Sequence, residues 1–284
     1  MKICAIIPVN GHEYMTTHCI LHVLDAAFEA DIDIHVQVVS NGDNPYDVTG
    51  KRLNEPLNVG INTIYNLVSA IHSKAALGYA EAVNTGLEFN KGYDGYLIMN
   101  NDAFVSKEYF KRLKLADIEA KVEGWGPLIY GPMTNQCAGI QEWHGLDQDV
   151  KAVRQLMENK FDGHLSAPSL FDLKPLTEKV VKNKRPVRRH VRWINGFCMY
   201  IDSKAFEMVG YFNQYRFPMS GEEIDWCLRA EGMGLLCTID FRNFVFHLKG
   251  VTCATEFDEE EKKRLWRRSA DKLREIYDNI NQQF

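Results

Sequence analysis

The sequence predicts an α/β protein with a mostly parallel central sheet flanked by helices, and three observations lead to that prediction. Continuous apolar runs at 3–8, 34–39 and 96–99 are typical of strands buried on both faces. Segments with helical apolar spacing separate these runs along the chain. The order strand, helix, strand, helix, strand is that of a doubly wound parallel sheet.

The first half of the chain supplies these elements in order. After the first strand at 3–8, residues 12–30 carry apolar residues at helical spacing. The second strand at 34–39 is closed by a dense turn signal at 40–45. Residues 61–68 are apolar enough for another short element, whose type the pattern leaves open.

A polar cluster, Asn100-Asn101-Asp102, directly follows the third apolar run. Polar side chains at the carboxyl end of a buried strand lie where an open α/β sheet places its ligand crevice. A carboxylate there suits a hard divalent cation that also binds substrate phosphates, because Mg²⁺ keeps only one or two protein carboxylates. The alternative is a solvated turn, since Asn and Asp are common turn formers.

Small residues recur at Gly78, Ala80, Ala82 and Gly86, at the start of a predicted helix that also carries Asn84. Close packing of the helix against the sheet is one explanation. The other is that a bare backbone at a helix start lets a diphosphate approach the amide groups and the positive helix end. We favour the second, because Asn84 and Gly86 extend the pattern beyond what packing requires.

The composition is that of a globular protein. At 284 residues, with 45% hydrophobic and 25% charged residues, the chain has room for one large α/β domain or two small ones. The net charge of -5 does not indicate wholesale coating of nucleic acid, although it permits a local basic groove. No stretch approaches the roughly 18 apolar residues of a membrane-spanning helix, and Pro8 interrupts the N-terminal run too early for a signal peptide.

Cysteine usage indicates the compartment. Seven cysteines are scattered through apolar segments without a C-x-x-C pair. This pattern is typical of buried thiols in a reducing environment, so we expect a cytoplasmic protein.

The motifs and their order resemble family 2 glycosyltransferases of the GT-A fold, among them rhamnosyltransferase-like nucleotide-sugar transferases. The matching segments are Ile6-Ile7-Pro8, the Gly-x-Ala-x-Ala-x-Asn-x-Gly spacing at 78–86, Asn100-Asn101-Asp102, Gly131-Pro132-Met133-Thr134-Asn135 with Gly139 and Gln141, Trp193-Ile194-Asn195-Gly196-Phe197, Gly210-Tyr211-Phe212-Asn213, Gly221-Glu222-Glu223-Ile224-Asp225, and His247. The resemblance covers about residues 3–250, and the order of the motifs is more specific than any one of them.

The resemblance implies a single GT-A domain over residues 1–250. Residues 1–105 are then the nucleotide-sugar-binding half. Residues 106–250 are the acceptor and catalytic half, which includes a basic connector at 151–192. Residues 251–284 add a C-terminal helical extension, whose apolar stripe we interpret as core packing.

The resemblance also implies roles for individual residues. Donor contacts are expected at Pro8, Asn10, Ser40, Asn41, Gly78, Ala82, Asn84, Asn100 and Asn101. The cofactor is Mn²⁺ or Mg²⁺, bound by Asp102 and His247 with Asn100 as a weaker contact. Glu223 is the expected base, and Glu222 and Asp225 shape its position and charge. Acceptor contacts are expected at Asn135, Trp193, Asn195 and Gly196.

Three positions depart from the family pattern. Ser40-Asn41 replaces the aspartate that usually contacts the nucleotide base, Val83 replaces an arginine, and Glu223 replaces the commoner aspartate. The first two leave the donor nucleotide open, and the third lengthens the reach of the base. A helix N-terminus that favours acids near its positive end is the alternative explanation of the acidic motif.

The basic connector allows two interpretations. Its arginines, which include Arg185, Arg188 and Arg189, form either a solvated face or a groove for a phosphate-bearing acceptor or for the donor diphosphate. We add these three residues to the expected acceptor contacts.

These observations together predict an inverting, metal-dependent glycosyltransferase, transferring a hexosyl or pentosyl unit from a nucleotide-sugar to a hydroxyl of a saccharide or glycoconjugate. Two alternatives stay open. One is transfer to hydroxymethylated bases in DNA, reached by base flipping, so that nucleic acid is a possible partner. The other is a nucleotide-sugar binder without activity.

Overall fold

The computed structural model describes residues 1–42, 67–75, 77–135, 141, 151, 173–182, 187–217, 220–248 and 259–277. The strands in this part of the chain are β1 (Lys2–Val9), β2 (Asp33–Asn41), β3 (Val68–Ser73), β4 (Gly95–Met99), β5 (Ala103–Val105), β6 (Ile129–Thr134), β7 (Arg188–Val191), β8 (Cys198–Asp202) and β9 (Cys237–His247). The helices are α1 (Glu13–Glu29), α3 (Tyr79–Phe89), α4 (Tyr109–Glu123), α6 (Lys174–Val181), α7 (Ser203–Val209), α8 (Glu222–Gly232) and α10 (Glu259–Ile276).

The strands form one sheet in the order β3-β2-β1-β4-β8-β6-β9-β5, with β7 paired to β9. Pairings among β1, β2, β3 and β4 are all parallel, as predicted. In the second half, β8 is antiparallel to both neighbours, and β9 is parallel to β6 but antiparallel to β5 and β7. The α/β class is therefore confirmed, while the parallel character belongs to the first half. An apolar run has the same pattern in either strand direction, so it could not reveal this difference.

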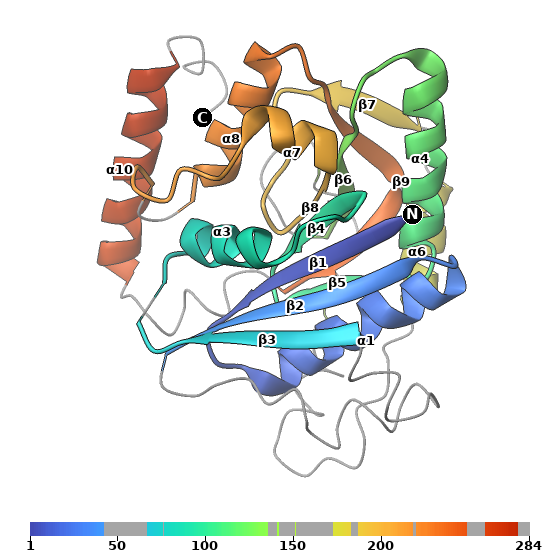
Figure 1. The fold of residues 1–284 in the computed structure, drawn as a ribbon, viewed down its shortest axis with the longest axis horizontal. Helices are drawn as coiled ribbons and strands as arrows, with labels where there is room; N and C mark the ends of the chain where they lie inside the picture. The colour runs from blue at the N-terminus through green and yellow to red at the C-terminus, as the bar shows by residue number, and fades with distance from the viewer. Residues whose placement is uncertain are drawn as a thin grey trace.

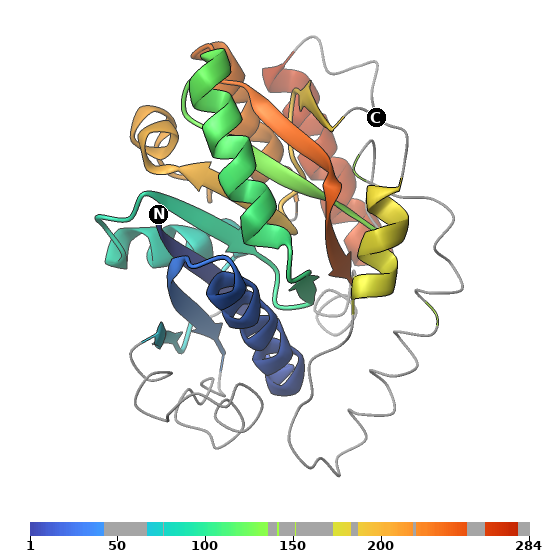
Figure 2. The ribbon, with the colours of Figure 1, turned by 90° about the vertical axis from the view of Figure 1, so that its right-hand side faces the viewer.

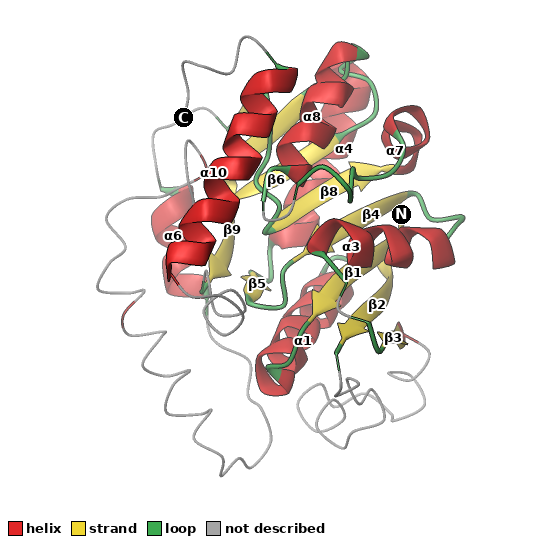
Figure 3. Ribbon diagram, turned by 90° about the vertical axis from the view of Figure 1, so that its left-hand side faces the viewer, coloured by secondary structure: helices red, strands yellow, loops and turns green. Residues whose placement is uncertain are grey.

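Helices cover both faces of the sheet. One face carries α1 and α4, which are in front of the strands in Figure 2. The opposite face carries α3, α7 and α8, which are in front in Figure 1. Beyond α8 lies α10, the helix next to it in Figure 3. The chain thus forms the three layers of helix, sheet and helix expected for buried strands.

The predicted apolar stripe of the C-terminal helix is only partly buried. Leu273 packs in a small cluster with Phe217, Ile224 and Leu228, as expected for core packing. Trp266, in contrast, is 56% exposed. None of the described helices combines the length and the apolar character needed to cross a bilayer.

Five cysteines in the described part of the chain are free and buried, which confirms the prediction of buried thiols for Cys4, Cys19, Cys198, Cys227 and Cys237. The other two, at positions 137 and 253, lie outside the described residues.

Gly78 and Gly86, the first and last glycines of the small-residue pattern, differ in whether packing requires a glycine. A Cβ at Gly86 would lie 2.5 Å from Ile6 Cγ2 and 3.3 Å from Val39 Cγ2. Gly86 is therefore required for the close approach of α3 to the sheet, so the packing explanation holds at this position. Gly78 has no atom within 4 Å of the equivalent point and no positive φ, so packing does not require it.

This difference gives a stability prediction. Gly86→Ala overpacks the contact between α3 and β1 and should lower the free energy of unfolding by about 1–3 kcal/mol. The matched control is Gly232→Ala in α8, where nothing lies within 4 Å. That variant should be neutral or stabilised by about 0.5–1 kcal/mol. Urea unfolding measures both values, and equal stabilities would contradict the packing role of Gly86.

Candidate active site

The start of β5 lies against the end of β9. Ala103, the first residue of β5, pairs with His247, the last residue of β9. The N–H of Leu248 also donates to the Asp102 carbonyl at 3.0 Å. This pairing brings Asp102 Oδ1 to 3.3 Å from His247 Nε2, and Asn100 Nδ2 to 3.5 Å from the same nitrogen. The predicted metal ligands Asp102 and His247, far apart in sequence, therefore meet in space.

Two neighbours hold His247 in place. Asn135 Oδ1 accepts from the His247 N–H at 2.8 Å, and Asn135 Nδ2 donates to the His247 carbonyl at 3.0 Å. Phe197 stacks on the imidazole with ring centroids 5.0 Å apart and an interplanar angle of 18°. Asn135, predicted to contact the acceptor, instead uses its amide on the backbone of His247.

The chemistry of the Asp102–His247 pair fits a divalent cation. Asp102 is 3% exposed, and its Oδ1 makes no hydrogen bond with a described residue, although His247 Nε2 lies 3.3 Å away. A buried carboxylate oxygen without a hydrogen bond is costly, and a cation between Asp102 and His247 would remove that cost. Among the described residues no group of three or more His, Cys, Asp or Glu side chains gathers for a metal. Two protein ligands suffice where a substrate diphosphate supplies others.

Asn101 does not join this pair. Its Nδ2 donates to Thr16 Oγ1 at 3.1 Å, and the Thr16 hydroxyl donates to the His12 carbonyl at 3.1 Å. Residues 100–103 form a tight turn closed by the Ala103 N–H, which donates to the Asn100 carbonyl at 3.2 Å. Asn101, inside this turn, points back onto α1, while Asn100 and Asp102 lie beside His247. Its predicted donor contact is replaced by a packing role at the start of α1.

The ends of β1 and β2 lie side by side, as the predicted donor site requires. Val9 pairs with Ser40, which places Pro8 and Asn10 beside Ser40 and Asn41. Asn41 Nδ2 donates to the Leu77 carbonyl at 3.2 Å. Its Oδ1 is buried and has no partner among the described residues. Asn41 thus keeps one acceptor that a ligand can use.

The start of α3 adjoins this edge of the sheet. Gly78 is its N-cap residue and makes no side-chain cap, so the first N–H groups of the helix lack an intrahelical partner. Open space around Gly78 leaves them accessible. Ala82, by contrast, is fully buried on the packing face of α3, and its N–H donates to the Gly78 carbonyl at 2.9 Å.

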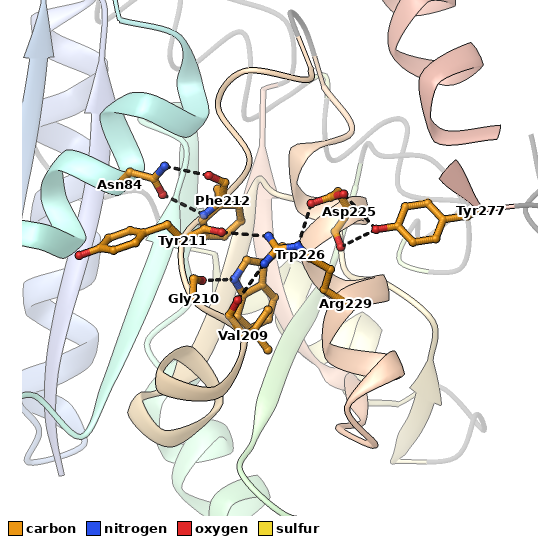
Figure 4. A network of polar contacts seen from close by, with 9 residues as sticks. All are labelled: Asn84, Val209, Gly210, Tyr211, Phe212, Asp225, Trp226, Arg229 and Tyr277. Atoms are coloured by element: carbon orange, nitrogen blue, oxygen red, sulfur yellow. Dashed lines mark hydrogen bonds and ion pairs between the residues drawn. The ribbon is translucent and has the colours of Figure 1, made fainter. Parts of the chain in front are cut away.

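Asn84 is likewise a structural residue. Its Nδ2 donates to the Phe212 carbonyl, and its Oδ1 accepts from the Phe212 N–H, both at 2.9 Å (Figure 4). The same Nδ2 donates to Gln214 Oε1 at 2.9 Å. With its amide fully used on the segment after α7, Asn84 cannot contact a donor as predicted.

The acidic pair, Glu222 and Glu223, opens α8. Glu222 is 7% exposed, and its Oε2 is buried without a partner in the described part of the chain. Glu223 is half-buried, and its Oε2 accepts from the Gly221 N–H at 3.1 Å. Burial, reinforced by the neighbouring Glu223, raises the pKa of Glu222 to about 8. Burial also raises the pKa of Glu223, and hydrogen bonds from backbone N–H groups partly offset this increase.

Tyr79, the first residue of α3, connects the two halves of the site. Its hydroxyl donates to the Gly196 carbonyl at 2.8 Å. Burial raises the pKa of Tyr79, and the nearby carboxylates of Glu222, Glu223 and Asp102 raise it further. The sequence analysis did not select Tyr79. Its position directly after Gly78, at the predicted helix start, was the available signal.

Asp225, predicted to shape the base, is fully engaged elsewhere. Arg229 Nε donates to its Oδ2 and Tyr277 Oη donates to its Oδ1, each at 2.9 Å (Figure 4). Its carboxylate therefore cannot take a proton from a substrate without losing an ion pair. Asp225 is three residues after Glu222 on a helix, but its side chain faces away from the acidic pair toward these partners.

The predicted acceptor residues separate into two kinds. Gly196 faces the acidic pair, because a Cβ there would lie 3.4 Å from Glu223 Cβ. Asn195 contacts Gln141 instead, with its backbone N–H and its Nδ2 both 2.8 Å from Gln141 Oε1. Trp193 is half-buried and packs against the core and the cluster beneath α10.

The basic connector does not reach this site. Arg188 makes ion pairs with Asp240 and Glu119, and its side chain is largely buried. It pairs in β7 with Asp240, seven residues before His247 on β9, a separation on the order of 20 Å along a strand. Arg189 is exposed on the same strand. The structure therefore places Arg188 and Arg189 away from the Asp102–His247 pair, and Arg185 lies outside the described residues.

No protein-family model matches the sequence, and no curated protein matches it. Solved structures do. GalNAc-T7 with UDP, GalNAc and Mn²⁺ aligns with a TM-score of 0.55 and 14% identity, over 87% of this chain and 44% of that one. TarS 1–349 of S. aureus in complex with UDP-GlcNAc aligns with a TM-score of 0.49 and 13% identity, over 96% and 67% of the two chains. This chain thus spans less than half the length of the GalNAc-T7 chain, and the likeness shows that it has the predicted GT-A fold.

The raised pKa of Glu222 predicts how stability depends on pH. Between the ordinary value of 4.5 and about 8, the folded state binds more protons than the unfolded state, so stability falls as pH rises through this window. Glu222→Gln should lose less of its free energy of unfolding between pH 5 and 8.5 than the wild type, by about 1 kcal/mol or more. Glu88→Gln, an exposed acid on α3, should keep the wild-type dependence. Urea unfolding from pH 5 to 8.5 checks this, and parallel curves for all three proteins would contradict it.

Proposed function

We propose that the chain is an inverting, metal-dependent glycosyltransferase that transfers a hexosyl or pentosyl unit from a nucleotide-sugar to a hydroxyl of a saccharide or glycoconjugate. The observation that carries this proposal is the segment Gly196-Phe197, which contacts both groups. A Cβ at Gly196 would lie 3.4 Å from Glu223 Cβ, while Phe197 stacks on His247 and its carbonyl accepts from the Asn100 N–H at 2.9 Å. A candidate metal site and a candidate base therefore border one site. The GT-A fold and the UDP and Mn²⁺ in the GalNAc-T7 structure support the same conclusion.

The donor nucleotide fits the edge formed by β1, β2 and α3. The free acceptor of Asn41 can receive a hydrogen bond from an N–H of the base or a hydroxyl of the ribose. The first N–H groups of α3, which lack an intrahelical partner and lie at the positive end of the helix, can bind the diphosphate. Asp102 and His247 would hold the cation, which when bound neutralises negative charge on the leaving diphosphate.

The acidic pair supplies the base. Burial raises both of its pKa values, so the pair retains a proton close to neutral pH. Glu223 is the better anion of the two, because its carboxylate accepts backbone N–H groups. It takes the proton of the acceptor hydroxyl as that oxygen bonds to the anomeric carbon. The bond to the nucleoside diphosphate breaks with its electron pair on the leaving oxygen, and one such displacement inverts the carbon.

Asp102 is the first residue to test. UDP with Mn²⁺ should raise the melting temperature of the wild type, because a ligand at 100 times its Kd stabilises by about 2.7 kcal/mol. Asp102→Asn should lose the Mn²⁺-dependent part of this shift. Asp31→Asn is the matched control, since Asp31 is exposed and its φ of 51° suits asparagine. A full shift in Asp102→Asn would contradict the metal assignment.

Glu223 carries the mechanism. A general base contributes typically 10²–10⁴-fold, so Glu223→Gln should lower kcat by about that factor with little change in donor binding. Release of nucleoside diphosphate from UDP-GlcNAc, UDP-GalNAc, GDP-mannose and dTDP-rhamnose, with Mn²⁺ and sugar acceptors, measures the rate. Loss of activity in Glu222→Gln alone would move the base to Glu222. Wild-type rates in both variants would exclude the proposed base.

A further inference from the structure

The C-terminal helix contacts the start of α8 at two points. Leu273 and Tyr277 are four residues apart, so they lie on one face of the helical end of α10. Leu273 Cδ1 lies 3.2 Å from the point that a Cβ of Gly221 would occupy. Tyr277 Oη donates to Asp225 Oδ1 at 2.9 Å. Gly221 and Asp225 are also four residues apart, and the acidic pair lies between them in the chain.

The backbone at this point needs such support. Ser220 has a φ of 56° and Gly221 a φ of 101°, both in the left-handed region. A non-glycine residue in that region is uncommon and persists only where its surroundings hold it. Phe217 packs from the other side, 3.3 Å from the same point at Gly221. The direction in which α8 begins therefore depends on contacts that α10 completes.

Asp225 links this contact to the rest of the site. Arg229 holds its other oxygen and also donates to the carbonyls of Val209 and Tyr211, at 2.8 and 2.9 Å. That segment is the one that Asn84 binds from α3 (Figure 4). A continuous set of hydrogen bonds thus runs from Tyr277 on the C-terminal side, through the start of α8, to the helix that begins at Gly78.

The chemistry of Tyr277 suits a permanent donor. Burial and the neighbouring Asp225 raise the pKa of Tyr277 to about 12, so its hydroxyl keeps its proton at all ordinary pH values. Asp225, which is 1% exposed, receives from it a hydrogen bond that water cannot replace.

We propose that Tyr277 is a positioning residue: by donating to Asp225 it fixes the first turn of α8 and thereby the placement of Glu222 and Glu223. The helical extension, which lies beyond the residues that carry the sequence resemblance, is then a component of the active site. The expected effect of Tyr277 on catalysis rests on the proposed function. Its effect on the first turn of α8 is measurable without any turnover.

The test compares Tyr277→Phe, which removes only the hydroxyl, with Tyr215→Phe. Tyr215 is 90% exposed and serves as the matched control. Amide hydrogen exchange over residues 220–228 should be several-fold faster in Tyr277→Phe and unchanged in Tyr215→Phe. Loss of a hydrogen bond to a charged group corresponds to about a tenfold effect or more, so kcat should fall about tenfold. KM for the nucleotide-sugar should not change, because the donor binds at the ends of β1, β2 and α3.

A double variant separates positioning from general loosening. If Tyr277 acts through Asp225, Tyr277→Phe should have no further effect on kcat in an Asp225→Ala background, where the acceptor of its hydrogen bond is gone. Unchanged exchange in Tyr277→Phe would overturn the inference, and so would faster exchange with an unchanged kcat. If the wild type turns over none of the nucleotide-sugars named above, the proposed function fails. In that case two measurements on Tyr277→Phe decide the inference without any turnover. One is amide hydrogen exchange over residues 220–228, and the other is the pH dependence of stability assigned to Glu222, which should differ from that of the wild type.

Discussion

The pairing of β5 with the end of β9 is the constraint on which the candidate site depends. It places Asp102, just before β5, against His247, the last residue of β9. Backbone hydrogen bonds supply the alignment, and the Asn135 amide reinforces it from β6. The sheet itself therefore holds the two side chains close together. A site built on strand ends is rigid in this way because few torsions separate it from the core.

Burial of the acidic pair, Glu222 and Glu223, carries a desolvation cost that the fold must offset. Two adjacent glutamates at the start of α8 are largely removed from water, which disfavours their charged forms. The positive end of the helix and the N–H of Gly221, which donates to Glu223, stabilise the charged carboxylates and offset part of this desolvation cost. The turn before them has left-handed backbone at Ser220 and Gly221. Strain and buried charge gathered at one turn are common at functional sites.

Buried amides explain most of the differences between the expected and the observed site. Asn84, Asn101 and Asn135 lie in motifs that resemble ligand-binding segments, yet each side chain satisfies protein groups. A buried backbone N–H or carbonyl outside regular structure needs a partner, and an asparagine supplies donor and acceptor together.

The amino-acid sequence by itself determined the elements of the first half, the α/β class and the strand-end carboxylate Asp102, because apolar periodicity and turn residues are local properties. It also identified Glu222 and Glu223 through their place in a motif. Only the tertiary structure decided that His247 meets Asp102, that Tyr79 binds the Gly196 carbonyl beside Glu223, and that Arg188 is used in ion pairs. Strand direction, side-chain orientation and long-range pairing depend on contacts between distant segments, and no local pattern encodes which partner a polar side chain will find.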